Sequence, residues 1–282
     1  MNDDAMSRLR SGTGNNRRQS SGGFTIVETM IVLAVSGLLL VSAVTLVAGQ
    51  QRKVEFSQAA MDIKSSIEQV ISDVGAGFYA NPGTFSCSVA GGNVSISAAA
   101  GAQQGSNNGC IFMGKAIQFG VQGTDPQQYI IHTVAGLQDN TGTLLSAKPV
   151  AIDLDSARDQ RELRNGLRAV SMTYEEAGIS RDVGAVAFIS SLGSRSSSDQ
   201  LVSGSQQVMV VPIDNTGKVP DTTIAGAVSG ISSQLRNATA NPASGVRICL
   251  TSGGGRSALI TVGKDGSSLA VRLDYKNSED CS

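Results

Sequence analysis

The sequence predicts an α+β protein in which one long N-terminal helix packs on a mainly antiparallel, β-rich head. Three observations lead to this prediction. An apolar run from Phe24 to Ala48 holds a single charge, Glu28. An apolar stripe at helical spacing continues to about Val74, and many short strand-like runs follow it. We therefore expect a leader (1–23), an apolar helix (24–48), its amphipathic continuation (49–80) and a globular head (81–282).

A polar leader precedes the apolar run. Its charged residues are Asp3, Asp4, Arg8, Arg10, Arg17 and Arg18. The basic excess favours keeping this segment in the cytoplasm. In an ordinary secretory signal, small residues at a cleavage site follow a short apolar core. Here Gly22 and Gly23 come before the apolar run, so cleavage after Gly23 would remove the leader and keep the helix.

The apolar run is long enough to cross a membrane. Residues Thr29–Ala48 alone would form a helix of about 30 Å, the thickness of a hydrocarbon core, with everything from about Arg52 onward outside. Glu28 lies at the start of this span. A carboxylate in a membrane costs on the order of 2.5–3.5 kcal/mol at a helix centre and less near an end. We interpret Glu28 as functional, because an uncleaved single-pass anchor would explain the span but not this residue.

The six residues Gly23-Phe24-Thr25-Ile26-Val27-Glu28 resemble the cleavage and methylation motif of type IV pilins and of the pseudopilins of type II secretion. The resemblance covers about residues 21–79. It implies cleavage after Gly23 by a prepilin peptidase, N-methylation of Phe24 and assembly into a helical filament. It also implies that Glu28 faces the N-terminal amine of a neighbouring subunit. Such a pair, about 4 Å apart, is worth about 4 kcal/mol at an effective dielectric of about 20 before desolvation.

The interior of the long helix offers two further clues. Gly37 lies near the middle of the span, where it favours close packing between helices or a place where the helix can stretch. No proline occurs between Phe24 and Ala80, whereas many major pilins have one, and this difference favours a minor subunit.

Beyond the span, apolar residues recur at steps of three and four. They are Ile63, Ile67, Val70, Ile71 and Val74. This stripe predicts packing of the helix against the head. Gly75 and Gly77 would end the helix, and Asn81-Pro82-Gly83 would form a turn.

The head shows seven strand-like runs and one predicted helix. The runs are Ile111–Phe119, Tyr129–Val134, Ala185–Ile189, Gln207–Ile213, Val246–Leu250, Ala258–Val262 and Leu269–Tyr275. The last two are joined by Gly263-Lys264-Asp265-Gly266, a hairpin signal. A helix is predicted at about Ser156–Val170, since Ser156 and Asp159 match a capping box.

Four cysteines lie on the side of the chain that should be outside: Cys87, Cys110, Cys249 and Cys281. An even number in an oxidising compartment predicts disulfides. Three pairings are possible, and sequence proximity favours Cys87–Cys110 and Cys249–Cys281. The first would clamp the insertion 91–109, and the second would pin the C-terminus to the sheet, as terminal loops often are in the pilin family. A metal site is the alternative, but the sequence contains no Cys-x-x-Cys spacing that would indicate one.

The sequence contains few candidates for catalysis. His132 lies in a strand-like run and is not tied to a nucleophile, so we expect a structural role. Asp153 and Asp155 lack the glycine and terminal glutamate of a calcium loop. Gly253-Gly254-Gly255-Arg256 lacks the lysine and hydroxyl of a phosphate loop and should connect two strands. We expect no enzyme activity, metal or cofactor.

Four arginines on the predicted 156–170 helix would share one face: Arg158, Arg161, Arg164 and Arg168. A solvated face paired with Asp159 and Glu162 is the simplest interpretation. Phosphate contact with DNA is the alternative. The leader holds four of the 22 basic and two of the 23 acidic residues, which leaves 18 against 21. This balance does not favour a protein that coats DNA.

The sequence therefore favours a structural subunit of a type IV pilus, more specifically a minor pilin. It would be a single-pass precursor in the plasma (inner) membrane and later part of an extracellular filament. Its partners would be other pilin subunits, the prepilin peptidase and the inner-membrane assembly platform. The alternatives are a pseudopilin of type II secretion and a filament-displayed module that binds DNA or acts as an adhesin.

Overall fold

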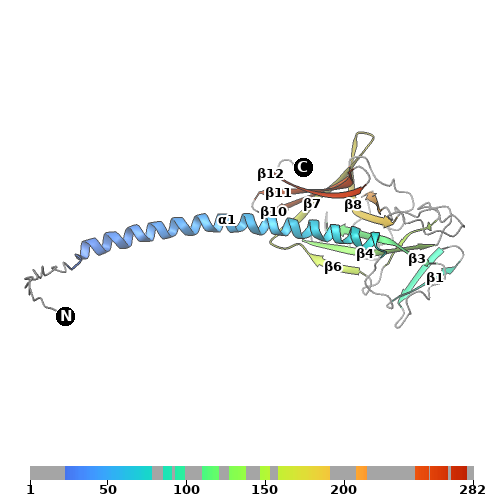
Figure 1. Cartoon of the computed structure of the whole chain (residues 1–282), viewed down its shortest axis with the longest axis horizontal. Helices are drawn as coiled ribbons and strands as arrows, with labels where there is room; N and C mark the ends of the chain where they lie inside the picture. Colours follow the sequence, from blue (N-terminus) through green and yellow to red (C-terminus); the bar gives the residue numbers. More distant parts are fainter. Residues whose placement is uncertain are drawn as a thin grey trace, which may run out of the picture. The chain divides into compact units, whose positions relative to one another are not determined.

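The computed structural model describes residues 23–77, 85–90, 93–98, 110–120, 127–137, 147–152, 158–190, 208–214, 245–253, 255–265 and 268–277. Within these ranges the chain forms one long helix, α1, and 12 strands (Figure 1). By its internal contacts the chain divides into two units, Met1–Gln51 and Arg52–Ser282. The predicted α+β class is confirmed.

Helix α1 covers Ile26–Gly75, 50 residues without interruption. Its length agrees with the absence of proline from residues 24–80. It ends where a glycine allows a left-handed backbone. Gly77 has a φ of +67°, and its N–H donates to the carbonyl of Val74 at 3.1 Å. The predicted end of the helix is therefore confirmed.

The strands follow the helix in the chain. They are β1 (Phe85–Ala90), β2 (Asn93–Ala98), β3 (Cys110–Phe119), β4 (Gln128–Leu137), β5 (Val150–Ala151), β6 (Arg158–Glu162), β7 (Leu167–Glu176), β8 (Ile179–Ser190), β9 (Val208–Asp214), β10 (Val246–Ser252), β11 (Arg256–Asp265) and β12 (Ser268–Asn277). The seven predicted runs lie in strands, apart from Gln207, which falls outside the described residues. The predicted hairpin between β11 and β12 is confirmed, but its turn is shorter than expected, because Gly263, Lys264 and Asp265 of β11 pair with β12.

The main sheet is antiparallel and has the order β12-β11-β10-β7-β8-β3-β4-β5, with β6 beside β4 and β9 beside β8. Strand β8 connects two parts. Its first residues pair with β7, and its later residues pair with β3 and β9. We call β7, β10, β11 and β12 the C-terminal half-sheet, and β3–β6, β8 and β9 the central half-sheet.

The second half of α1 lies against both half-sheets. Its buried residues are Phe56, Ala59, Ala60, Ile63, Ser66, Ile67, Val70 and Val74. The predicted stripe is confirmed, although Ile71 is only partly buried. Each fully buried Ile or Val contributes roughly 1.5–3 kcal/mol relative to an exposed one, so this stripe fixes the helix on the head.

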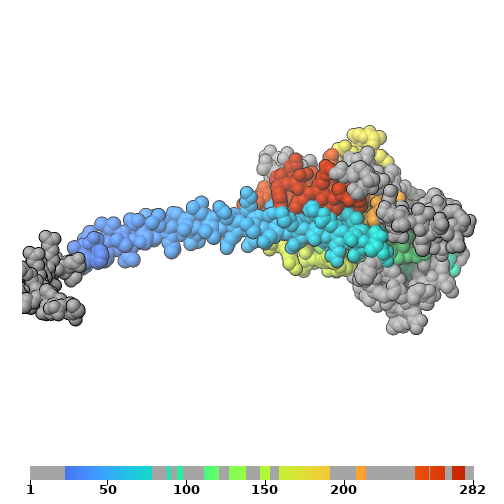
Figure 2. Space-filling model, viewed as in Figure 1, coloured from blue at the N-terminus to red at the C-terminus, as the bar shows by residue number. Residues whose placement is uncertain are grey.

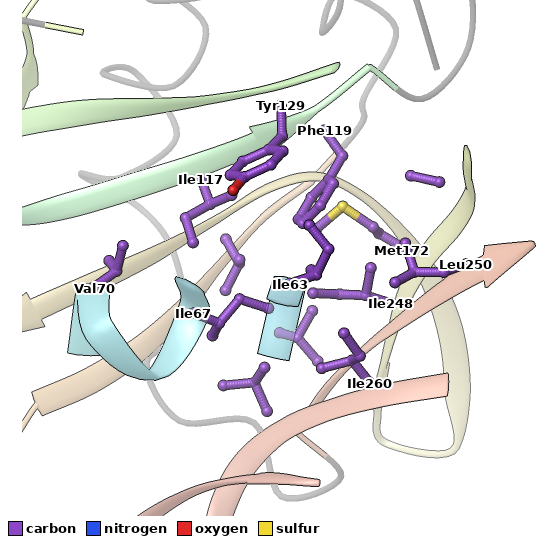
Figure 3. Close-up of a cluster of buried hydrophobic side chains, with 14 of the residues drawn as sticks. Ile63, Ile67, Val70, Ile117, Phe119, Tyr129, Met172, Ile248, Leu250 and Ile260 are labelled. Atoms are coloured by element: carbon purple, nitrogen blue, oxygen red, sulfur yellow. The ribbon is translucent and has the colours of Figure 1, made fainter. Parts of the chain in front are cut away.

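Side chains from both half-sheets surround this stripe. Figure 3 shows Ile63 and Ile67 in one cluster with Ile117, Phe119, Tyr129, Met172, Ile248, Leu250 and Ile260. The rings of Phe119 and Tyr129 are stacked, with centroids 5.5 Å apart. One core thus joins helix, central half-sheet and C-terminal half-sheet. At the last turns of α1, Lys115 on β3 adds an ion pair, its Nζ 2.6 Å from Asp73 Oδ2.

The predicted helix at Ser156–Val170 is wrong. Strands β6 and β7 occupy its described part, separated by a tight turn at Asn165 and Gly166 with φ of 56° and 68°. Strand β6 pairs with β4, so the capping-box interpretation of Asp159 fails. In β7 the residues alternate between buried and exposed, as Leu167 and Arg168 do. The Asn-Gly step and this alternation were the signals for strands.

Strands β1, β2 and β5 were also not predicted. Strands β1 and β2 form a separate two-stranded hairpin. Strand β2 lies inside the 91–109 insertion, for which no strand was predicted. The alternation of Val94 and Ile96 with Ser95 and Ser97 was a strand signal that the sequence reasoning did not use. The expected turn at residues 81–83 lies outside the described residues.

Candidate functional site

The first candidate site is the N-terminus of α1. Gly23 and Phe24 are exposed and precede the helix. Thr25 caps it, since the N–H of Glu28 donates to Thr25 Oγ1 at 3.2 Å. The pattern Thr25-x-x-Glu28 is that of a capping box, a signal that the sequence reasoning did not use.

Glu28 lies in the first turn of α1 and is exposed. The N-terminus of a helix carries a partial positive charge that favours a carboxylate there. Among the described residues, no ion pair involves Glu28. The folded subunit therefore stabilises the charge only partly, and the carboxylate is accessible to a cation from another molecule.

The first half of α1 exposes apolar side chains along its whole length. Leu33, Leu38 and Leu46 are 72%, 70% and 72% exposed. This is the one described helix that is long and apolar enough to cross a membrane, and none of its most apolar stretch is buried. An apolar surface of this size marks contact with lipid or with other protein.

Gly37 is not required by packing inside the subunit. A Cβ atom at this position would meet nothing within 4 Å. The small residue therefore serves either a contact with another molecule or the flexibility of the helix, and both interpretations remain open.

The cysteines are described only in part. Cys249 on β10 is 3% exposed and disulfide-bonded. The side chains of Cys87 and Cys110 lie outside the described part of the chain, as does Cys281. The pairings Cys87–Cys110 and Cys249–Cys281 therefore stay predictions.

The four arginines do not share a helix face, because the helix is absent. Arg161 lies on β6, Arg164 in the turn after it and Arg168 on β7. Arg158 begins β6, and its side chain lies outside the described part. The geometric reason for a row of guanidinium groups therefore no longer holds.

Arg161 is held within the subunit. Its Nε donates to Asp159 Oδ2 at 2.8 Å, and its Nη1 donates to Ser66 Oγ on α1 at 3.0 Å. The hydroxyl of Tyr129 donates to the same Ser66 Oγ at 3.1 Å. The hydrogen bond to Asp159 raises the pKa of the Arg161 guanidinium above its usual value. This arginine therefore connects β6 to α1.

A groove runs between α1 and β6 beside this network. It is lined by Ala59, Asp62, Ile63, Ser65, Ser66, Gln69, Tyr129, Arg161, Glu162 and Arg164. Its charged groups are of both signs, and Arg161 is already engaged. We find no convergence of acid, base and nucleophile in this groove.

The remaining candidates agree with structural roles where they are described. His132 is 0% exposed, and its Nε2 is 3.1 Å from Gln118 Oε1, so no substrate can reach it in this conformation. The Gly253–Arg256 segment joins β10 to β11, as expected of a hairpin connection. Asp153 and Asp155 lie outside the described residues.

Comparison with known proteins gives one match. A family model described as the prokaryotic N-terminal methylation motif matches residues 18–44. The match includes the end of the leader, the Gly23–Phe24 junction and most of the apolar run. No curated protein and no solved structure matches the chain.

Proposed function

Because the chain is a type IV pilin-like protein with a prokaryotic N-terminal methylation motif, we propose that it is a structural subunit of a type IV pilus, and specifically a minor pilin. The precursor is held in the plasma membrane with its head outside. A prepilin peptidase cleaves after Gly23, and Phe24 becomes N-methylated. At the inner-membrane assembly platform the subunit joins other pilin subunits and enters an extracellular filament, with no enzymatic step of its own.

The exposed apolar surface after the motif carries this proposal. The large apolar side chains of the first half of α1 are more than half exposed from Phe24 to Val47. In water this surface would cost roughly 25 cal/mol for each Å² left uncovered. Lipid covers it in the precursor, and neighbouring helices cover it in the filament.

Glu28 gives the filament its register in this proposal. Cleavage frees the α-amine of Phe24, and the exposed Glu28 carboxylate of a neighbouring subunit is available to pair with it. The desolvation of both charges offsets much of their attraction. The ion pair thus selects one register, while apolar packing supplies most of the cohesion.

Cleavage is tested by replacing Gly23. Gly23→Ala should leave the leader attached, because a side chain at this position would hinder the peptidase. Intact mass measured on the membrane fraction reads the result directly. Gly22→Ala is the matched control and should be processed. A mature chain that begins at Met1, or beyond the apolar run, would overturn the proposal.

Assembly is tested by replacing Glu28. Glu28→Val should insert into the membrane as well as the natural chain does. Its amount in sheared filaments should fall at least about tenfold, a difference of about 1.4 kcal/mol. Glu55→Val, which removes another exposed carboxylate of α1, is the control and should assemble. Equal incorporation of both variants would exclude the proposed role of Glu28.

A pseudopilin of type II secretion would have the same N-terminal chemistry. The long helix without proline supports a minor subunit, and it does not separate a pilus from a secretion pseudopilus. Detection of the protein in purified surface fibres would support the pilus. A deletion that stops the release of secreted proteins while fibres persist would support the alternative.

A filament-displayed module that binds DNA or a receptor has weaker support. Arg158, Arg161, Arg164 and Arg168 were the candidate DNA contacts. If they bind DNA, Arg158→Ala with Arg161→Ala should lower the affinity and reduce its salt dependence by about one unit for each phosphate that is no longer neutralised. Arg164→Ala with Arg168→Ala is the cleaner pair, because both side chains are exposed. Unchanged binding in both double variants would dismiss the idea.

A further inference from the structure

We propose that one end of the head is a binding surface for anionic phospholipid headgroups, which it contacts while the subunit is in the membrane before assembly. This inference rests on the proposed function, since it requires that the apolar run lies in a bilayer before assembly. The surface consists of six basic residues, which we call the proximal rim: Arg52, Lys53, Arg164, Arg168, Arg256 and Lys276.

The register of the C-terminal half-sheet brings part of the rim together. Leu167, Ser252, Arg256 and Asn277 lie opposite one another across β7, β10, β11 and β12. The next row contains Arg168 and Lys276. The turn with Arg164 comes directly before β7. Four of the six basic residues therefore lie at the same end of the half-sheet.

Contacts with α1 place that end of the half-sheet beside residues 55–57 of the helix. Asn165, in the turn with Arg164, donates from Nδ2 to the carbonyl of Glu55 at 3.0 Å. Tyr275, in the row after that of Lys276, has its Oη 2.7 Å from Ser57 Oγ. Arg52 and Lys53 precede Glu55 by three and two residues, which is less than one turn of helix. Figure 2 shows the β10–β12 region and the β6 region on two sides of this part of α1.

The length of chain to the membrane matches the headgroup layer. Arg52 follows Ala48, the last residue of the apolar run, by four residues, which is about 6 Å of helix. The polar layer on each side of a bilayer is about 5–8 Å thick. Arg52 thus lies within reach of the phosphates, and long basic side chains can extend further.

The charges differ between the two ends of the half-sheet. Among the described residues, no ion pair involves a rim residue. Three exposed acids lie two residues from a rim residue in the chain: Glu55, Glu162 and Asp274. At the opposite end the bases are paired, Arg181 with Glu176 at 2.9 Å and Arg247 with Glu175 at 3.1 Å. Within the described part of the half-sheet, the surplus of cations outside ion pairs therefore lies at the end where the chain arrives from the apolar run, and an anionic surface would attract it.

Because the chain contains no tryptophan, a single introduced one can report the position of the rim. The full chain carrying Ser252→Trp, the rim reporter, would be reconstituted in vesicles of phosphatidylcholine with about 30% phosphatidylglycerol and a nitroxide-headgroup lipid. The distal reporter carries Ser180→Trp at the opposite end instead. We expect the nitroxide to quench the rim reporter at least twofold more than the distal reporter. Quenching of the rim reporter should fall by at least half in pure phosphatidylcholine or in 0.5 M salt.

The matched variants remove three charges each. Arg164→Gln, Arg256→Gln and Lys276→Gln together should reduce the quenching of the rim reporter by at least half. Arg181→Gln, Arg247→Gln and Arg272→Gln together should not. The proposal would be overturned if both reporters were quenched equally, or if quenching of the rim reporter were the same with and without phosphatidylglycerol. If either of these results is found, and the triple variant Arg164→Gln, Arg256→Gln and Lys276→Gln also loses binding to duplex DNA, the rim binds nucleic acid instead of lipid.

The outcome separates this inference from the proposed function. If the chain resists alkaline extraction from the vesicles but the headgroup nitroxide does not quench the rim reporter, only the proposal for the rim fails. A chain that alkaline extraction removes from the vesicles is not membrane-spanning, and both proposals then fail.

Discussion

The two halves of α1 share one continuous helix and treat apolar surface in opposite ways. From Ile26 to about Gln51 the apolar side chains are exposed. From Phe56 to Val74 a single stripe is buried against the half-sheets. The second half obtains its covering surface from its own chain. The first half depends on another molecule to cover its apolar surface, and the proposed function identifies that molecule as lipid or a neighbouring helix.

The largest expected effect comes from removing a buried side chain of the second half. Ile67 is 1% exposed, so Ile67→Ala should lower the free energy of unfolding of the head by about 3–4 kcal/mol. Leu38→Ala is the matched change in the first half, where the side chain is 70% exposed. It should change the same quantity by less than about 0.5 kcal/mol. Urea denaturation in detergent measures both, and similar decreases would contradict the comparison.

The second effect concerns the disulfide of Cys249. Asn277 lies opposite Arg256, which lies opposite Ser252 on the strand of Cys249. From Asn277 to Cys249 is therefore about 14 Å by strand geometry. Four further residues span up to about 13–14 Å, so Cys281 is within reach of Cys249.

Loss of a Cys249–Cys281 bridge should destabilise the head by about 3–4 kcal/mol on the chain-entropy estimate and leave the first half of α1 helical. Cys281→Ser tests the stability, with Ser282→Ala as the control. Peptide mapping without reduction tests the pairing. A peptide that joins Cys249 to Cys87 or Cys110 would refute it.

A third, smaller effect distinguishes two ion pairs of the second half. Lys115 and Asp73 have side chains that are 11% and 23% exposed. Asp73→Asn leaves the Lys115 ammonium without its partner and should cost about 2 kcal/mol, below the roughly 3–5 kcal/mol for a fully buried pair. Glu68→Gln breaks the exposed pair with Lys64 and should cost less than about 1 kcal/mol. Thermal unfolding of both variants would test the difference, and equal shifts would contradict it.

The smallest effect lies at the start of the first half. Thr25→Ala removes the cap on the Glu28 N–H and should destabilise the first turn by about 1 kcal/mol. Amide hydrogen exchange at Glu28 should then rise about fivefold, while head unfolding stays unchanged. Thr25→Ser keeps the hydroxyl and is the control. Exchange that is equal in all three proteins would show that the cap is unimportant.

The sequence was a reliable guide where one physical signal dominated. The absence of proline and the stripe from Ile63 to Val74 predicted the helix and its buried face. Apolar runs predicted the strands that are buried on both sides. The residues of the N-terminal motif could be found because their spacing is local.

The errors arose where two signals competed. Ser156 and Asp159 suggested a helix, whereas Asn165-Gly166 and the alternation in β7 indicated strands, and pairing with β4 and β10 decided the outcome. Contacts such as Lys115–Asp73 join residues 42 apart in sequence. Local patterns do not contain them, since they depend on how the helix lies on the sheet.

The stripe of α1 also has a mechanical consequence. If the subunit assembles into a filament as proposed, tension on the filament reaches the head through α1. The buried side chains from Phe56 to Val74 are then sheared together over about 27 Å, so the force is shared among all of them. A helix seated in this way resists extraction far better than one that could be peeled off turn by turn.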